Sequence, residues 1–570
     1  MPRTPTRATA RADAPLRQYA CGNKSDFRAG RPLRHPAHPL SGLRDSTGES
    51  PSNCGLAVDS ATQIRAAGAR SVEYVKICSL YGVGYYYIPG TDTCIKIGGY
   101  VRFEAYHNDA GGLFPNSTPQ GIMTRSASPF AMQARFRLTG DVRTQTEYGT
   151  LRSYFAFGVN ALTNPGGAYD LNNPTLALAF ERGFIQFAGF SIGRVDTFFA
   201  FYNGAAYGLV PFFTDGSSGP SGLNVFAYTW QFGNGLSATF SVEDPGAHSA
   251  PVINLGRATA GATGGVLGAG IAGQPALGAW GLNAGREVPD FVANLRVDQA
   301  WGSAQIMGAV HRVGARFYYN DNSGPDTGAG QENAANQCSN AGALTASCGH
   351  PSDKWGWAVG GGLTLKMPWD AKDTLSGVIA YSEGAVRYVA FGAANNQLFT
   401  TQGYGIGAFN DAVYGADGAS NNDRSELLLT KAWGGTVAFE HYWTPSLRTS
   451  WVFGYLSIEY SDAAKVQISN LGEYCMAGGA QVNKGQIGHL AACDPDWSMW
   501  RLSSRTMWNP VANLDVGLEV AYTQVNTAFE GGFDLSAGNP ANTGLSKGGY
   551  HFNDTSVWSA TLRVQRSFWP

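Results

Sequence analysis

Residues 96–106 read KIGGYVRFEAY and residues 130–143 read FAMQARFRLTGDVR. In both stretches every second residue is apolar or glycine, and most of the residues between them are polar or charged. A repeat of two residues is the signature of a β-strand with one apolar face. A soluble β-sandwich would show the same alternation, so the number of strands and the lengths of their connections must distinguish it from a membrane barrel.

The same kind of pattern recurs along the chain and predicts about sixteen strands. We place them at 96–106, 130–143, 149–159, 177–187, 190–198, 223–231, 236–243, 290–299, 303–318, 354–366, 374–391, 433–443, 447–460, 499–508, 513–524 and 553–568.

The connections between these strands alternate between short and long. The short ones carry turn residues, as in FGNG at 232–235 and TPS at 444–446, whereas the long ones are rich in Gly, Asn, Ser and Ala. Bacterial outer-membrane barrels combine an even number of antiparallel strands with short periplasmic turns and long external loops. The sequence therefore predicts an all-β fold, a transmembrane antiparallel β-barrel with long external loops.

The composition agrees with a barrel and argues against other classes. The 570 residues include 75 Gly, 12% are aromatic and 14% are charged. We find no uncharged apolar run of about 18 residues, which a membrane-spanning helix would need. A net charge of −2 gives no reason to expect a nucleic-acid partner. The nine His belong to no catalytic motif, so we expect no enzyme activity, no metal and no cofactor.

The cysteines indicate the compartment. Six of the eight group by proximity into the pairs Cys78/Cys94, Cys338/Cys348 and Cys475/Cys493. Such pairs suit local disulfides in an oxidising compartment, and free thiols in a reducing cytosol are the alternative.

The domain organisation follows from these patterns. We expect a periplasmic N-terminal segment with the first cysteine pair at 71–95 and the barrel at 96–568. Residues 1–70 contain ten Arg and no apolar segment of the kind that a signal sequence needs. We expect them to be disordered or a spurious extension produced by a mistaken start, and a cytosolic protein is the alternative.

The stretch at 81–106, YGVGYYYIPGTDTCIKIGGYVRFEAY, resembles the opening of the porins of alphaproteobacteria such as Brucella and rhizobia. Residues 193–199, 224–228 and 232–239 are similar to the third-loop region of that family and to the hairpin after it. The resemblance covers about 72–568. It implies a sixteen-stranded, trimeric general-diffusion porin of the outer membrane, in which the third long loop folds into the barrel and narrows the pore.

The end of the chain departs from that family, which usually finishes on a Phe. Here Trp569 and Pro570 follow Phe568. We expect this difference to affect the efficiency of assembly rather than the fold.

A charge-lined pore filters solutes by sign and size. The polar faces of the first strands carry a candidate basic wall formed by Lys96, Arg102, Arg135, Arg137, Arg143 and Arg152. The third loop would supply the facing acids, Asp196 at its base and Asp215 within it. The alternative is that some of these arginines lie at a rim, paired with Glu104, with Asp141 or with lipid headgroups. We expect at least two of Arg102, Arg135 and Arg137 to line the narrow part, in a weakly anion-favouring or nearly neutral pore.

These expectations describe an outer-membrane porin for passive diffusion of small hydrophilic solutes and ions. Its partners would be outer-membrane lipid, those solutes and two further copies in a homotrimer. A solute-selective channel for sugars or anions is an alternative, because several aromatic residues follow residue 197. A surface adhesin-like barrel, with the long loops as its contact surface, is another.

Overall fold

The structure is a computed structural model, and it describes part of the chain. The described residues are 76–108, 130–163, 175–201, 206–210, 216–217, 222–253, 283–315, 350–389, 396–400, 403–407, 409–415, 426–465, 490–535 and 548–568. They all belong to the compact unit Glu73–Pro570. Among the described residues, no helix has both the length and the apolar character needed to cross a membrane.

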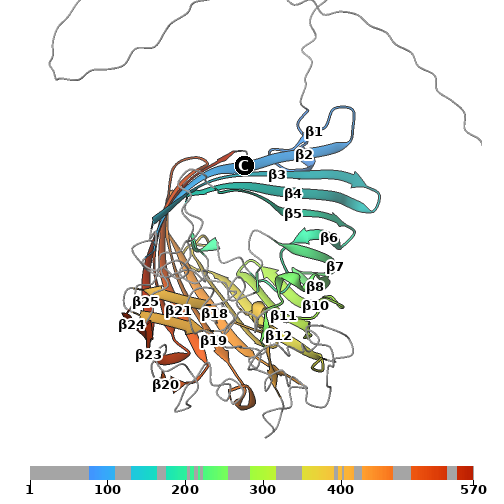
Figure 1. Cartoon of the computed structure of the whole chain (residues 1–570). Helices are drawn as coiled ribbons and strands as arrows, with labels where there is room; N and C mark the ends of the chain where they lie inside the picture. The colour runs from blue at the N-terminus through green and yellow to red at the C-terminus, as the bar shows by residue number, and fades with distance from the viewer. Residues whose placement is uncertain are drawn as a thin grey trace, which may run out of the picture. The chain divides into compact units, whose positions relative to one another are not determined.

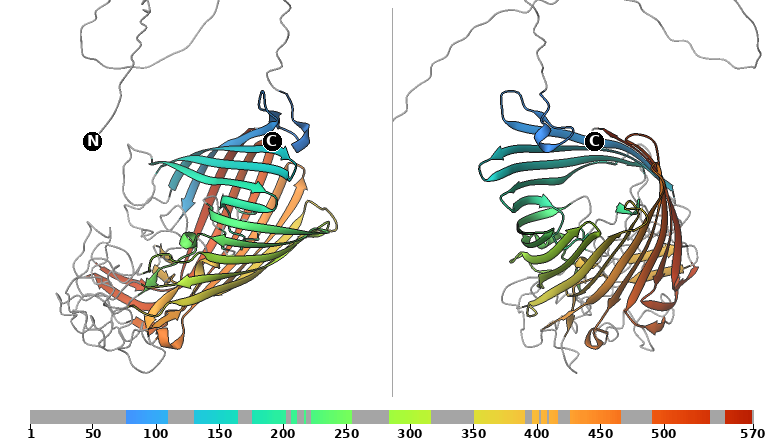
Figure 2. Two further views of the ribbon diagram at one scale, coloured as in Figure 1. Left: turned by 90° about the vertical axis from the view of Figure 1, so that its right-hand side faces the viewer. Right: turned by 180° about the vertical axis from the view of Figure 1, so that it is seen from behind.

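The main sheet is a closed antiparallel barrel (Figures 1 and 2). It contains seventeen strands, of which β1 (Tyr86–Tyr87) pairs only with β2, and the other sixteen form the ring. Neighbouring strands in the ring also follow one another along the chain, and β25 returns to pair with β2. The sixteen predicted strands are therefore confirmed.

The ring consists of β2 (Thr93–Asn108), β3 (Phe130–Thr146), β4 (Gly149–Thr163), β5 (Thr175–Phe187), β6 (Phe190–Val195), β7 (Leu223–Gly233), β8 (Leu236–Glu243), β10 (Asp290–Gln299), β11 (Gly302–Val313), β12 (Lys354–Lys366), β13 (Thr374–Glu383), β18 (Lys431–Thr444), β19 (Leu447–Glu459), β21 (Trp497–Val511), β22 (Leu514–Asn526) and β25 (Thr555–Phe568).

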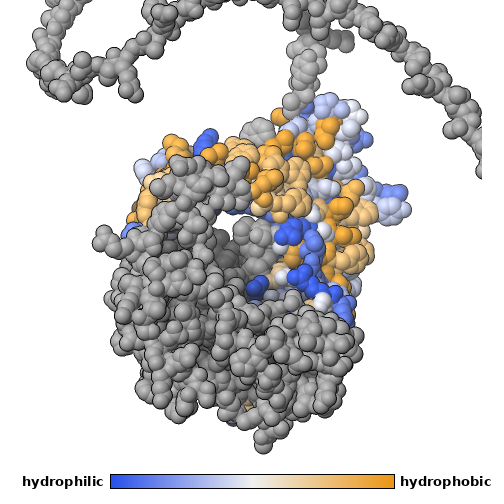
Figure 3. Space-filling view, in the orientation of Figure 1, coloured by the Kyte–Doolittle hydropathy of each residue, from blue (hydrophilic) through white to orange (hydrophobic). Residues whose placement is uncertain are grey.

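The alternation in the sequence becomes the two faces of the wall. On β2, Val101 and Phe103 are 54% and 41% exposed on the outside, whereas Glu104, on the opposite face, is only 2% exposed. Hydrophobic residues cover the outward surface of the first strands, and hydrophilic residues border the opening (Figure 3). Exposed apolar side chains on the outside of a closed sheet are the arrangement that a lipid bilayer requires.

The turn between β7 and β8 shows why this hairpin forms here. Asn234 and Gly235 both have positive φ angles, 50° and 73°. Two successive residues with positive φ form the type I′ turn that suits a hairpin, and Asn-Gly is its preferred sequence. A Cβ atom on Gly235 would lie only 1.9 Å from the Asp298 carbonyl oxygen, so no larger residue fits.

Tryptophans mark the rim that carries the short turns. Trp301, Trp369, Trp443 and Trp508 are each at least 45% exposed and lie within or beside these turns. Aromatic side chains at the ends of barrel strands form the interfacial girdle of such proteins. Tyr85, by contrast, is buried next to the N-terminal disulfide.

Three strands are clearly shorter than predicted. Those predicted at 190–198 and 303–318 end at Val195 and Val313, and the third differs most. The prediction at 374–391 extends beyond β13, which ends at Glu383. Gly384 follows with a φ of +64°, and the chain turns into the 3-10 helix η8 (Val386–Tyr388). Tyr388 is fully buried. The apolar residues that resembled a strand therefore pack among the loops instead of extending the wall.

The long connections contain further structure that the sequence pattern does not predict. A five-stranded sheet contains β14 (Asn396–Thr400), β15 (Gly403–Gly407), β24 (Gly548–Phe552), β23 (Phe529–Leu535) and β20 (Leu490–Cys493), and a three-stranded sheet contains β17 (Glu426–Leu429), β16 (Ala412–Gly415) and β9 (Val252–Ile253). The short 3-10 helices η1 (Ser79–Tyr81) and η4 (Pro245–Ala247) complete the elements named here.

Candidate pore constriction

The described residues of the connection between β6 and β7 lie inside the barrel, as the loop resemblance implies. Phe201 packs on Gly362 of β12. Tyr207 packs on Ala438 and Val452, from β18 and β19. Val210 packs on the far side, against β2 and β3. We call the described residues 196–201, 206–210 and 216–217 the inner loop. It contacts the wall at widely separated strands, so it crosses the lumen.

Hydrogen bonds fix the middle of the inner loop to the wall. The Ser450 hydroxyl donates to the Tyr207 carbonyl at 2.6 Å. The carboxylate of Glu519 on β22 accepts the backbone N–H groups of Leu209 and Val210, the second at 3.2 Å. Arg563 on β25 donates to the Leu209 carbonyl at 3.0 Å. Charged and polar side chains of the wall thus satisfy the loop backbone, whose buried polar groups need partners.

The two ends of the inner loop are held as well. Ser217 donates to Asp196 Oδ2 at 2.9 Å, and the Phe198 N–H donates to Glu243 at 2.9 Å. His248 Nε2 donates to the Gly216 carbonyl at 2.8 Å. Burial lowers the pKa of His248, so its ring is neutral in this contact. The inner loop is therefore anchored at its base and along its course.

Arginines on β2, β3, β5 and β25 form a basic surface on the inner wall beside the loop. We call Arg102, Arg135, Arg137, Arg182 and Arg563 the arginine wall. Arg102 donates to Gln565 at 2.8 Å and lies 3.8 Å from Glu104, to which Arg563 also pairs. Arg182 lies 3.8 Å from Asp196, at the base of the inner loop.

Glu181 is the central carboxylate of this surface. It pairs with Arg135 and, at 2.7 Å, with Arg137. Gly158 on β4 leaves the space for the cluster, since a Cβ there would lie 2.8 Å from Glu181 Oε1. The Glu181 side chain is 2% exposed, against 12% and 27% for its partners. The arginines therefore present the accessible charge.

The sequence interpretation missed Glu181, because a β-bulge changes the phase of β5. The register shifts so that Ala156 and Phe157 oppose Arg182 and Phe180, which leaves Glu181 as the extra residue. A signal was present in the apolar pattern. Residues on one face of a regular strand have either all even or all odd residue numbers. On β5, however, both Phe180 and Ile185 are exposed on the outer face. Such a change of phase within one strand indicates a bulge.

The structure places the six predicted basic residues at three locations. Arg102, Arg135 and Arg137 lie on the arginine wall. Arg143 and Arg152 both pair with Asp141, at 3.0 and 2.8 Å, next to the short turn after β3. Lys96 donates to the Val83 carbonyl at 3.2 Å, beside the N-terminal segment. Asp196 lies at the base of the inner loop, whereas Asp215 is outside the described residues.

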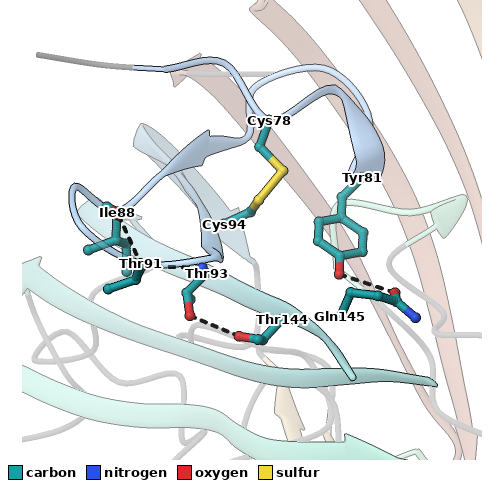
Figure 4. The surroundings of a disulfide bond; sticks show 8 residues. All are labelled: Cys78, Tyr81, Ile88, Thr91, Thr93, Cys94, Thr144 and Gln145. Atoms are coloured by element: carbon teal, nitrogen blue, oxygen red, sulfur yellow. Dashed lines mark hydrogen bonds between the residues drawn. A yellow bond between two sulfur atoms is a disulfide. The ribbon is translucent and has the colours of Figure 1, made fainter. Parts of the chain in front are cut away.

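The N-terminal segment is joined to the barrel by a disulfide between Cys78 and Cys94 (Figure 4), as predicted for this pair. Cys94 belongs to β2, and Tyr85 packs on both cysteines. Next to it, Thr93 and Thr144 share a hydrogen bond of 2.9 Å across β2 and β3. Cys338, Cys348, Cys475 and the side chain of Cys493 lie outside the described residues, so those two pairs stay predictions.

Removing this disulfide is expected to loosen the N-terminal segment. The bridge closes a separation of 16 residues, for which the loop-entropy model gives about 3 kcal/mol. In Cys78→Ser, chymotrypsin is expected to cut at Tyr85, Tyr86 and Tyr87 at least about tenfold faster. Reduced wild type serves as the matched control and should behave like the variant. Equal cleavage of oxidised wild type and variant would contradict the expectation.

Comparisons with known proteins identify the family that the chain resembles. A sequence model of the family described as the porin subfamily matches residues 63–559. Porin Omp2b of Brucella canis is 32% identical over 191 residues, which are 33% of this chain and 49% of that porin. Porin Omp2b of Brucella suis biovar 1 is 31% identical over 191 residues, which are again 33% of this chain and 49% of that porin. The matched region thus spans about half the length of these curated relatives.

Among solved structures, the outer membrane channel DcaP of Acinetobacter baumannii is similar with a TM-score of 0.49 and 13% identity. That match covers 85% of this chain and 99% of the DcaP chain.

Proposed function

Because the chain belongs to the porin subfamily, we propose that it forms a water-filled channel for passive diffusion of small hydrophilic solutes and ions. Family membership and the closed sixteen-strand wall place it in the outer membrane as a multi-pass β-barrel. The family also implies a channel rather than an enzyme.

The observation that supports the channel best is the inner loop fixed across the lumen beside the arginine wall. The loop carries its own hydrogen bonds to Ser450, Glu519 and Arg563, so it holds its position without a bound partner. A rigid polar constriction in a barrel whose outer face is apolar can select solutes by size and sign. No bond needs to be made or broken.

We further propose that the channel prefers anions. At the constriction, the five members of the arginine wall face three carboxylates, Glu104, Glu181 and Asp196. The difference of two positive charges raises the local concentration of anions. This charge balance favours an anion-preferring pore over a sugar-selective one.

A homotrimer is also part of the proposal, and it rests on the resemblance to porins of alphaproteobacteria. Outer-membrane lipid would contact the exposed apolar side chains of each barrel, such as Leu178, Ile306 and Ile379.

The test is single-channel conductance of the refolded protein in a planar lipid bilayer, with a salt gradient across it. We expect stable ohmic steps, a reversal potential that shows anion preference, and closure in thirds at high voltage. If protein that migrates as a folded, heat-modifiable barrel shows no conductance, the proposed channel is rejected and a surface-interaction role is favoured. A reversal potential of the opposite sign would reject only the anion preference.

A further inference from the structure

A cavity of about 380 Å³ lies among the connections after β8, β11 and β13, and none of its lining residues belongs to the inner loop or to the arginine wall. Three arginines line it, Arg286, Arg312 and Arg387, together with Ser249, Asn283 and Glu287. We call this cavity the arginine pocket. Three guanidinium groups around one small cavity are a frequent arrangement for binding an oxyanion.

The pocket is held in shape by its own hydrogen bonds. Asn283 Nδ2 donates to the Ala250 carbonyl at 2.7 Å, and Asn283 Oδ1 accepts the Val252 N–H at 3.1 Å. The Ala284 N–H donates to the Gly314 carbonyl at 2.8 Å. These bonds join the connection before β10 to those after β8 and β11. The walls are therefore preorganised, which reduces the entropy that binding would cost.

Two of the three arginines have carboxylate partners. Arg312 pairs with Glu287 at 2.8 Å and also with Asp353. Arg286 lies 3.9 Å from Asp244, and its side chain is 59% exposed. An exposed pair at that distance is weak and leaves the guanidinium able to take another partner.

Arg387 differs from the other two. Its Nη1 donates to the Ala247 carbonyl at 3.3 Å, but its Nε is buried and meets no hydrogen-bond acceptor within the described part of the chain. No ion pair to a carboxylate is formed by Arg387 among those residues. The carboxylate of Asp411, in the same region, accepts the N–H groups of Ala250 and Val386. A partly buried guanidinium without a counter-ion loses hydration that nothing replaces unless something pairs with it.

We propose that the arginine pocket binds an oxyanion, the phosphate or carboxylate group of a small solute or of a lipid headgroup. Arg387 is the principal ligand, because its guanidinium has no carboxylate partner among the described residues and carries the forked N–H donors that an oxyanion accepts. Arg286, at the exposed side, adds a second positive charge. The arginine pocket shares no lining residue with the constriction, so oxyanion binding there does not require that the channel conducts.

The test is isothermal titration of the full chain, refolded in detergent, with inorganic phosphate at low ionic strength. Wild type is expected to show one saturable site. Arg387→Gln is expected to weaken binding at least about tenfold, the usual effect of losing a charge-assisted pair. Arg387→Lys keeps the charge but not the fork, so its affinity should fall between the two.

The matched control is Lys372→Gln, which removes one positive charge from the short turn between β12 and β13. It should bind phosphate like wild type. A folded Arg387→Gln variant that binds like wild type would overturn the proposal, and so would a wild type with no saturable site. If Arg387→Gln does not fold, the Arg387→Lys affinity decides, and an affinity equal to wild type would reject the fork.

The source of the oxyanion is decided by competition. Addition of lipid A, whose phosphates lie at the outer membrane surface, abolishes phosphate binding if the pocket serves a headgroup and leaves it intact if it serves a free solute. The same preparation is tested for conductance. A conducting channel without phosphate binding overturns the pocket alone, whereas binding without conductance overturns only the proposed channel.

Discussion

Replacing Arg135 and Arg137 together with glutamine is expected to lower the concentration of anions at the constriction roughly fivefold, and so to reduce the preference for anions over cations. In a water-filled lumen a unit charge about 8 Å away contributes about 0.5 kcal/mol, so two charges contribute about 1 kcal/mol. The double change also leaves the carboxylate of Glu181 without its two partners. The measurement is the reversal potential of single channels in a salt gradient.

Two comparisons make this result specific. Arg143 and Arg152, changed together to glutamine, lose the same charge beside Asp141 rather than at the arginine wall, and screening by salt should make their effect smaller. Glu181→Gln should shift the selectivity in the opposite direction, toward anions. If the two double variants have equal reversal potentials, the arginine wall does not control selectivity.

Glu519→Gln is expected to have the largest effect on the stability of the channel. Glu519 accepts two backbone N–H groups of the inner loop and pairs with Arg501 at 3.1 Å. Both side chains are at most 4% exposed. The variant leaves Arg501 as a buried unpaired charge, which costs about 3–5 kcal/mol. We expect a lower unfolding temperature, and frequent current fluctuations as the inner loop leaves the wall.

A second variant separates these two effects. In Glu519→Gln with Arg501→Met, no unpaired charge remains, so the unfolding temperature should recover while the fluctuations persist. Asp141→Asn is the matched control, because it removes a carboxylate from the inner face without a contact to the described part of the inner loop. If Glu519→Gln channels show no more current fluctuations than wild type, the Glu519 carboxylate does not hold the inner loop.

Much of the fold can be predicted from the sequence, because a barrel strand carries its pattern locally. The alternation at 96–106 and 130–143 depends only on which face meets lipid, and Asn234-Gly235 specifies its turn without help from distant residues. The pair Cys78/Cys94 is also close in sequence, and the structure confirms it.

The site is less predictable, since its contacts join residues far apart in the sequence. Arg102 meets Gln565 across 463 positions, and Leu209 meets Glu519 across 310. No local pattern places an inner loop against particular strands. Glu181 was missed because one extra residue on β5 reverses its face. If residues of β5 alternated strictly between the two faces, counting from Ile185, Glu181 would lie on the outer, membrane-facing side.

The pairing of β2 with β25 also limits how the protein can be made. Ten residue pairs join these strands, from Gly99 with Phe568 to Asn108 with Ser559. Until they meet, each strand has an unpaired edge, which in a membrane is costly and in water invites aggregation. Contacts of such long sequence separation form slowly. Insertion therefore depends on shielding both edges until the last strand has been delivered, by detergent during refolding or by a factor in the cell, and a nascent chain that lacks β25 has no closed form.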